Sequence, residues 1–340
     1  MYINNSMLFF SKQKKMEKVE SNIPWNEKYR PNKVSDMVGQ KNIINSLKNS
    51  IKSGNFPNLL FYGPSGLGKT SAIISVAKEL FKDEYNNRVM ELNASEERGI
   101  RIIRNKIKGF AKSSVNVNHS SNNIPNIKLI ILDEADNITN DAQNALRRSM
   151  EMYSNNTRFC IICNYISKII DPITSRCSMY KFYKLKEEEF TKKLRNICDF
   201  ENIKYEKGIL SKIFNTSNGD LRKGISILEF SSTISDNYIK YEDLLLISGN
   251  FQTSNFKLLF KNSLSEEQIF QFSYEIIKKG YCLRKIIKLF IKEIMYNDLL
   301  LEEEKINIIE DIYYSEKYLV RGSSPLLSLI NIFINFQKKE

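Results

Sequence analysis

Histidine is nearly absent from this chain, which has only His119 among its 340 residues. That residue lies in a Ser- and Asn-rich stretch, so we expect no catalysis or metal binding that depends on histidine. Long apolar runs are missing too, since none approaches the ~18 residues that a membrane-spanning helix needs. We therefore expect neither a histidine-based site nor a membrane partner.

Cysteines are few and scattered, and their number is odd. The five are Cys160, Cys163, Cys177, Cys198 and Cys282. We expect reduced thiols in an intracellular compartment, because this set shows no disulfide framework. Cys160 and Cys163 form a C-x-x-C pair, but a zinc site would need a second pair at a suitable spacing, and the chain has none. Buried strand cysteines are therefore the better interpretation.

Two segments are too polar to predict a packed structure. Residues 1–22 are rich in Asn, Ser and Lys, and their one apolar patch at 7–10 is too short for a secretory signal. No arginine precedes Arg30, unlike in a transit peptide, so we expect a disordered tail. Residues 112–126 are rich in Asn and Ser and predict a flexible surface insertion.

Positive charge exceeds negative charge. Lys and Arg number 51 against 39 Asp and Glu, which gives a net charge of +12 and a pI near 9.2. This balance favours an acidic partner such as nucleic acid, although a lysine-rich composition alone gives many proteins the same charge. With 42% hydrophobic residues, the chain is long enough for two or three domains with cores of their own.

Glycine is also sparse, at 13 residues, but three glycines fall within residues 63–70, Gly-Pro-Ser-Gly-Leu-Gly-Lys-Thr. This is the G-x-x-x-x-G-K-[ST] pattern, in which backbone N–H groups surround phosphate oxygens, Lys69 reaches the β- and γ-phosphates and the Thr70 hydroxyl binds Mg²⁺. A glycine-containing turn is the alternative, but strand 58–62, loop and helix 70–80 follow in the required order. We predict nucleoside triphosphate binding by Gly63, Pro64, Ser65, Gly66, Leu67, Gly68, Lys69, Thr70 and Ser71.

A second phosphate-site element follows at residues 129–136, Leu-Ile-Ile-Leu-Asp-Glu-Ala-Asp. A buried strand that ends in Asp-Glu would place both carboxylates at the edge of the sheet beside the loop. Asp133 would hold Mg²⁺ through water, and Glu134 would polarise the water that attacks the γ-phosphate. A strand capped by an acidic turn is the alternative, but after a phosphate-binding loop we favour the functional interpretation.

Three further polar residues are candidates for the same reaction. Asn164 follows the apolar run 159–163 and would orient the attacking water or contact the γ-phosphate, although an Asn at a strand end is more often a turn former. Arg176 is poorly placed for its own loop and well placed to reach a neighbour's γ-phosphate in trans. Arg222 would contact the chain's own γ-phosphate. A solvated arginine is the alternative at both positions.

Helices and strands alternate from residue 37 to residue 184. Strands are predicted at 58–62, 88–92, 127–132, 158–163 and 179–183, with helices near 40–52, 70–80, 99–111 and 139–151. Near-continuous apolar strands with helices between them indicate an α/β fold with a parallel sheet covered on both faces. After residue 185 strand signals stop, and the chain predicts short amphipathic helices up to 248 and a separate helical bundle from 250.

The loop, the Asp-Glu strand, Asn164 and Arg222, in this order and with a helical lid, resemble an AAA+ ATPase. Further segments are similar to the small subunits of replication factor C. They are Trp-Asn-Glu-Lys-Tyr-Arg-Pro at 25–31, Val38-Gly39-Gln40, Glu-Leu-Asn-Ala-Ser-Glu-Glu-Arg-Gly-Ile at 91–100, Ala-Leu-Arg-Arg-Ser-Met-Glu at 145–151 and Ile-Asp-Pro-Ile-Thr-Ser-Arg-Cys at 170–177. The resemblance covers about residues 24–230 and is nearest to the animal subunit-four and budding-yeast subunit-two type.

The chain departs from that family at three positions. Ser65 and Leu67 stand where the family usually has Pro and Thr, and Glu96 stands at an Asp position. Neither loop side chain is required for phosphate binding, so we expect the activity to be retained. The change at Glu96 would alter the turn before the next helix.

The resemblance implies a domain order, an activity and partners. After the tail expected at 1–22, it implies an AAA+ P-loop NTPase domain at 23–184, a helical lid at 185–248 and a helical collar at 249–340. It implies ATP hydrolysis with Mg²⁺ in a hetero-pentamer of replication factor C subunits. That assembly would open the sliding clamp PCNA and load it onto primer–template DNA, in replication and repair, in the nucleus. Val38, Gly39 and Gln40 join the expected nucleotide contacts.

A basic helix is the candidate for DNA binding. Arg98, Arg101, Arg104 and Lys108 fall on or just before the helix predicted at 99–111. A solvated basic face is the alternative, but in the family the corresponding helix follows duplex phosphates, so we favour phosphate contact, with Lys168 as a second candidate. Such contacts would be non-specific, and each would add about −0.9 to the log–log salt slope.

Three other functions remain open at this point. An AAA+ DNA motor, such as a branch-migration or helicase-loading ATPase, would unwind DNA processively as the isolated chain. A DEAD-box helicase is suggested only by the letters Asp-Glu-Ala-Asp at 133–136, and the surrounding elements do not fit that family. A catalytically silent scaffold subunit is disfavoured by the intact Lys69, Glu134 and Arg222, and an ATP-binding assay distinguishes it.

Overall fold

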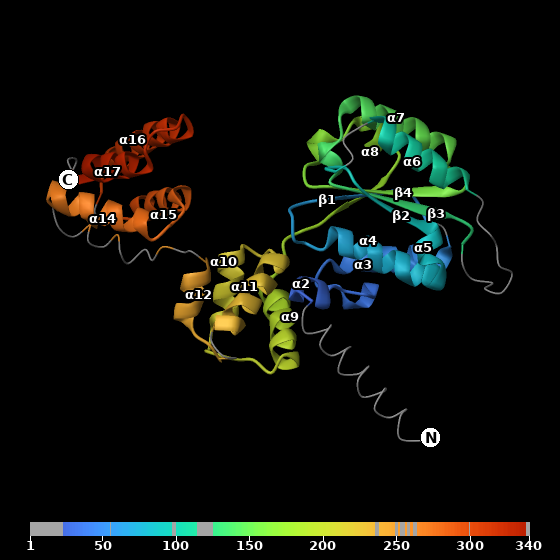
Figure 1. The fold of residues 1–340 in the computed structure, drawn as a ribbon, viewed down its shortest axis with the longest axis horizontal. Coiled ribbons are helices and arrows are strands. Elements are labelled where there is room, and N and C mark those ends of the chain that lie inside the picture. The colour runs from blue at the N-terminus through green and yellow to red at the C-terminus, as the bar shows by residue number, and fades with distance from the viewer. Residues whose placement is uncertain are drawn as a thin grey trace, which may run out of the picture. The chain divides into compact units, whose positions relative to one another are not determined.

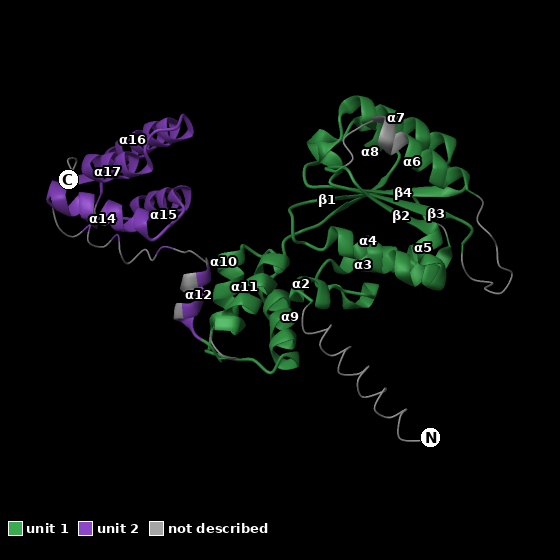
Figure 2. Cartoon of the chain, viewed as in Figure 1, with its two compact units in different colours: residues 1–239 green, residues 240–340 purple. Residues whose placement is uncertain are grey.

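The computed structural model divides the chain into two compact units, residues 1–239 and 240–340 (Figure 2). It describes residues 23–54, 56–96, 100–113, 125–234, 238–248, 251, 256, 259–260, 264–298 and 300–337. The predicted tail at 1–22 and most of the predicted insertion at 112–126 lie outside this part of the chain. The first unit holds the sheet and the helices up to 234 together, so this division leaves the boundaries at 184 and 248 as predictions.

A five-stranded parallel sheet forms the centre of the first unit (Figure 1). Its order is β2-β3-β4-β1-β5, and every neighbouring pair is parallel. The strands are β1 (Leu59–Tyr62), β2 (Val89–Asn93), β3 (Lys128–Asp133), β4 (Thr157–Cys163) and β5 (Ser178–Lys181). The predicted α/β fold with a parallel sheet is confirmed, with strand ends within two residues of the predicted ones.

Helices cover both faces of this sheet, as its apolar strands require. Figure 1 shows α3 (Lys41–Ser53), α4 (Lys69–Phe81) and α5 (Tyr85–Arg88) on one side, and α6 (Ile100–Lys112), α7 (Asn140–Met152) and α8 (Asp171–Thr174) on the other. In β1, Leu59 and Phe61 join one hydrophobic core and Leu60 joins the other. Cys160 and Cys163 are buried in β4, as the sequence predicts.

The sheet is followed by a group of helices that we call the lid. It consists of α9 (Glu187–Phe200), α10 (Ile209–Ser217) and α11 (Leu221–Ile234). The short helix α2 (Trp25–Lys28), which the sequence did not predict, packs against α11. The expectation that strands stop at residue 185 is wrong in one detail, because β6 (Lys204–Tyr205) pairs in parallel with β7 (Tyr238–Ile239). Two-residue strands carry no alternation of apolar and polar residues, so their sequence does not reveal them.

The described part of the second unit is helical. It contains α12 (Tyr241–Ser248), α14 (Glu266–Lys278), α15 (Leu283–Met295), α16 (Glu302–Val320) and α17 (Pro325–Gln337). Phe290 and Phe333 are fully buried, with their ring centroids 5.3 Å apart. Within the described residues, no helix of either unit combines the length and apolar content needed to cross a bilayer.

Candidate nucleotide site

The loop between β1 and α4 has a backbone that only glycine adopts readily. Gly63, Gly66 and Gly68 have φ angles of +139°, +72° and +85°. A Cβ at Gly63 would lie 2.5 Å from the carbonyl oxygen of Phe182. One at Gly66 would lie 1.8 Å from Oδ1 of Asp220. Both the conformation and the close approach of neighbours therefore require glycine, and the loop leads directly into the N-terminus of α4.

Lys69 is the first residue of α4 and is 7% exposed. Its Nζ donates to the carbonyl oxygens of Gly63 and Pro64, each at 2.7 Å, and to Oδ1 of Asn164 at 3.0 Å. Burial lowers the pKa of Lys69, and the nearby carboxylate of Asp133 counteracts only part of that effect. The ammonium group is thus held by neutral oxygens, in a place where an anion would be stabilised.

Thr70 and Asp133 bring two oxygen atoms that could act as metal ligands together at the carboxyl ends of β1 and β3. The Thr70 hydroxyl donates to Oδ2 of Asp133 at 2.7 Å, and the other carboxylate oxygen accepts from the backbone N–H of Glu134 at 2.8 Å. Oxygen donors of this kind suit Mg²⁺. Among the described residues there is no cluster of three or more His, Cys, Asp and Glu side chains that would hold a metal by itself.

Glu134 and Asn164 lie at the same edge of the sheet. Glu134 has a φ of +53°, and its side chain is exposed and accepts from Nδ2 of Asn137 at 3.4 Å. Asn164 follows β4, which lies between β3 and β1 in the sheet. That position explains how one amide side chain reaches Lys69 from a strand 95 residues further along the chain.

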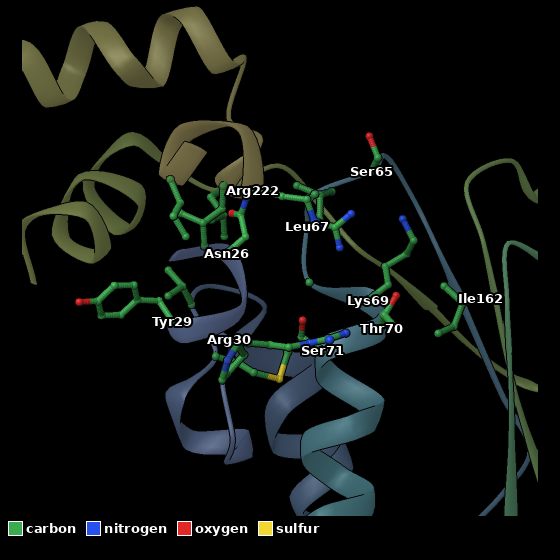
Figure 3. A pocket seen from close by; sticks show the side chains of 18 of the residues that line it. Asn26, Tyr29, Arg30, Ser65, Leu67, Lys69, Thr70, Ser71, Ile162 and Arg222 are labelled. Carbon is green, nitrogen blue, oxygen red and sulfur yellow. The ribbon is translucent and has the colours of Figure 1, made fainter. Parts of the chain in front are cut away.

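A pocket connects these groups with the lid and with the N-terminal segment (Figure 3). Ser65, Gly66, Leu67, Gly68, Lys69, Thr70, Ser71, Asp133, Glu134 and Asn164 line it, as does Val38. From the lid come Lys193, Leu221, Arg222 and Ile225. The structure therefore brings most of the predicted nucleotide-binding residues to one pocket, and those assignments stay predictions.

One wall of the pocket consists of residues that are not among the predicted nucleotide contacts. Asn26, Glu27, Tyr29, Arg30, Pro31, Asp36 and Met37 line it. The Trp-Asn-Glu-Lys-Tyr-Arg-Pro motif was the available signal, but a motif does not show which of its residues face a ligand. Gly39 and Gln40 lie outside the lining. Gln40 instead pairs with the backbone of Tyr183, at 2.5 Å to its carbonyl oxygen and 3.3 Å from its N–H group.

Arg222 and Arg176 occupy different surroundings. Arg222 is an exposed residue of α11 and lines the pocket, where its charge contributes to lowering the pKa of Lys69. Arg176 is absent from the lining. It forms an ion pair with Oε1 of Glu151 at 2.7 Å and donates to the carbonyl oxygen of Pro172 at 2.7 Å. The structure therefore does not bring Arg176 to its own chain's pocket.

The predicted DNA-binding residues are only partly described. Arg98 lies outside the described residues, and of Arg101 and Arg104 the structure describes only the helical backbone in α6. Lys108 is exposed on that helix. Lys168 is also exposed, with its Nζ 5.4 Å from the centre of the Tyr165 ring. Their assignment to DNA stays a prediction.

Comparison with protein families matches the chain in three segments. Residues 59–185 match the ATPase family associated with various cellular activities (AAA). Residues 192–233 match the RCF1/5-like AAA+ ATPase lid domain, and residues 255–334 match the replication factor C C-terminal domain. The solved structure of the Thermotoga maritima RuvB Holliday junction branch migration motor is similar in fold, with a TM-score of 0.51 and 14% identity over 71% of this chain and 83% of that one.

Relatives with curated names support a closer grouping. Replication factor C subunit 2 of Oryza sativa subsp. japonica is 39% identical over 92% of this chain and 94% of its own length. Replication factor C subunit 4 of Homo sapiens is 38% identical over 91% and 86%. Replication factor C subunit 2 of Saccharomyces cerevisiae is 49% identical over 62% and 61%. The chain therefore belongs to the replication factor C small subunits and is an AAA+ ATPase.

Proposed function

We propose that this chain is an ATP-binding and ATP-hydrolysing small subunit of a replication factor C clamp loader. In a hetero-pentamer with the other subunits, it would help to open the sliding clamp PCNA and load it onto primer–template DNA. That activity would serve replication and repair in the nucleus. The observation that supports it most is the meeting of Lys69, Asn164 and the Thr70–Asp133 pair at one edge of the sheet.

The geometry supports a different role for each of these residues. Three oxygen atoms already hold the Lys69 ammonium group in position. The ammonium group would exchange them for the β- and γ-phosphates, whose negative charge would offset the cost of burying the lysine. Thr70 and Asp133 would hold Mg²⁺, which neutralises charge on the phosphates when bound. Glu134 would accept a proton from the attacking water, and Asn164 would fix the position of that water or of the γ-phosphate.

Two arginines would connect the site to other parts of the assembly: Arg222 to movement of the lid, and Arg176 to a neighbouring subunit. Arg222 reaches the pocket from the lid, so the charge of the nucleotide would influence the lid angle. Arg176 lies away from its own pocket and would act on a neighbour's γ-phosphate. Lys108 and Lys168, with Arg98, Arg101 and Arg104, would hold duplex phosphates without reading sequence.

The test is Glu134→Gln in the reconstituted complex. We expect this subunit's ATP binding to be retained and hydrolysis at its site to fall by about 10²–10⁴-fold, because the amide does not accept the proton. ATP-dependent PCNA binding should persist, and release of PCNA on primer–template DNA should slow. Asp141→Asn, at an exposed carboxylate in the first turn of α7, is the matched control. Unchanged hydrolysis in Glu134→Gln, or processive unwinding by the isolated chain, would contradict the proposal.

A further inference from the structure

Residues 25–34 form a segment, here called the strap, that borders the nucleotide pocket. Five consecutive or nearly consecutive positions of the strap line the pocket: Asn26, Glu27, Tyr29, Arg30 and Pro31. Figure 3 shows Asn26 and Tyr29 on the side of the pocket opposite Lys69 and Ser65, with Arg30 near Ser71. The first half of the strap therefore lines the part of the pocket that is opposite the phosphate-binding lysine (Figure 3).

The first half of the strap is tied to lid helix α11. The backbone N–H of Trp25 donates to Oε1 of Glu229 at 3.1 Å, and Nδ2 of Asn26 donates to Oγ of Ser226 at 2.7 Å. The two acceptors are three residues apart on one helix, so they lie on the same face. Two bonds to one face fix both the position and the direction of this half of the strap.

Glu201 adds an ion pair to the contacts between the strap and the lid. It lies directly after α9 and accepts hydrogen bonds from Nζ of Lys28, at 2.6 Å, and from the hydroxyl of Tyr29. The side chain is only 20% exposed. Burial alone would raise the pKa of Glu201, but the bonds from Lys28 and Tyr29 outweigh it and leave the pKa below its ordinary value. Burial and the bond to Glu201 raise the pKa of Tyr29, so the hydroxyl stays a donor.

The second half of the strap is tied to α4, the helix that begins with Lys69. The carbonyl oxygen of Pro31 accepts from Oγ of Ser75 at 2.8 Å, and the backbone N–H of Val34 donates to Oε1 of Glu79 at 2.7 Å. Val34 is fully buried in the core formed by α3, α4 and the sheet. One half of the strap thus belongs to the lid and the other to the phosphate-binding helix.

We propose that the strap couples the lid to the phosphate-binding helix and that Glu201 is a positioning residue for nucleotide affinity. By holding Lys28 and Tyr29, Glu201 keeps the strap ordered against the pocket before nucleotide arrives, so less conformational entropy is lost on binding. A change in lid angle that moves Glu201 moves the pocket wall with it. The inference rests on nucleotide binding at this pocket and adds a means by which the lid regulates it.

The chain carries its own reporter for this contact. Trp25 is the only tryptophan, and it lies in the strap with its ring centroid 6.3 Å from that of Tyr29. Its fluorescence emission should therefore respond to nucleotide and to the loss of the Glu201 contacts. The experiment titrates Mg-ATP and Mg-ADP separately into the full-length chain and follows Trp25 emission and the dissociation constant.

We expect Glu201→Ala to raise the dissociation constants of both nucleotides by roughly tenfold, which is the size expected for losing hydrogen bonds to a charged group. ATP and ADP should be affected equally, because Tyr29, which Glu201 holds, lies on the side of the pocket opposite Lys69 (Figure 3). Tyr29→Phe should also raise the dissociation constants of both nucleotides. In the double variant, the dissociation constant should rise by more than in either single variant, but by less than the product of the two single-variant factors. Glu188→Ala, an exposed glutamate of α9, is the matched control and should bind as the wild type does.

Each outcome separates this inference from the proposed function. If the wild-type chain fails to bind nucleotide, the proposed function fails with it. If the wild type binds but Glu201→Ala and Tyr29→Phe bind equally well with unchanged Trp25 emission, only the strap inference is overturned. A double variant whose dissociation constant rises by the full product of the two single-variant factors would also overturn the strap inference. If Glu201→Ala unfolds, Glu201→Gln and Lys28→Met repeat the test, with thermal unfolding confirming that they fold.

Discussion

A buried lysine with neutral partners is costly to the folded chain and useful to a ligand. Lys69 is such a residue, because its three acceptors are two carbonyl oxygens and one amide oxygen. We expect Lys69→Met to change the thermal stability of the nucleotide-free chain little, because lost hydrogen bonds are offset by removal of the buried charge. The stabilisation by Mg-ATP, about 2.7 kcal/mol at a hundredfold excess over Kd, should disappear in scanning calorimetry.

Lys52→Met is the control for that measurement, because Lys52 is an exposed lysine of α3. It should keep the full stabilisation by Mg-ATP. A Lys69→Met chain that ATP stabilises as strongly as the wild type would show that the loop is not the phosphate site.

Glu201 gives a prediction about pH. Its pKa is lower in the folded chain than the ordinary value of 4.5, so the unfolded state binds more protons in the interval between the two values. The contribution of Glu201 to stability is therefore present above pH 4.5 and is lost as the pH falls through the folded pKa. Urea unfolding from pH 7 to pH 3 should show a stability difference between wild type and Glu201→Gln that shrinks on acidification. A difference that grows would contradict this sign.

Single residues differ in how far the sequence predicts them. Lys69 and Thr70 belong to a local pattern in which neighbouring residues fix one another's roles, and Asp133 ends a recognisable strand. The bond between Tyr29 and Glu201 spans 172 residues, so it depends on how the lid packs and has no local signal. Gln40 is a third case, since its motif is recognisable but its side chain holds the backbone of Tyr183.

At the scale of elements, the C-terminus of α6 depends on a side chain from the sheet. Lys128 is 1% exposed, and its Nζ donates to the carbonyl oxygen of Phe110 at 2.6 Å and to Oγ of Ser113 at 2.7 Å. We expect Lys128→Met to destabilise the fold by about 1–3 kcal/mol, because the C-terminus of α6 loses a charged donor and the Phe110 carbonyl oxygen keeps the neutral hydroxyl of Ser113 in its place. Hydrogen exchange should speed up in the last turn of α6. Lys112→Met, at an exposed lysine of the same helix, should show neither effect.

Elements with a long hydrophobic pattern were the ones that the sequence predicted well. The three inner strands β1, β3 and β4 are buried on both faces, so their apolar runs are nearly continuous and end where the chain leaves the core. The four-residue helix α2 and the paired strands β6 and β7 are too short for such a pattern. Their positions come from packing against the lid, which is a tertiary effect.

At the scale of the whole assembly, Arg176 should matter to a neighbour and not to its own chain. We expect Arg176→Ala to lower ATP hydrolysis at the adjacent subunit by roughly 10³-fold or more, in line with other arginine fingers. Nucleotide binding by this chain should be unchanged, because Arg176 is absent from its pocket. The measurement uses two reconstituted complexes, one in which only the adjacent site is active and one in which only this chain's own site is active.

Arg195→Ala, at an exposed arginine of the lid, is the matched control for those complexes. Loss of hydrolysis only in the mutated subunit's own site would show that the trans assignment is wrong.

If Arg176 acts on a neighbour as proposed, its ion pair with Glu151 would also affect recognition between subunits. A long side chain that is free in solution loses about 0.5–1.5 kcal/mol of entropy when an interface immobilises it. Arg176 is already restrained by Glu151 and by the carbonyl oxygen of Pro172. In the proposed role, Arg176 would therefore already be pre-organised when it meets a neighbour, with its charge partly neutralised by the carboxylate of Glu151. An approaching phosphate would have to displace that carboxylate from Arg176. Weakly charged surfaces should therefore bind poorly to the face that carries Arg176, and a correctly placed triphosphate should bind better.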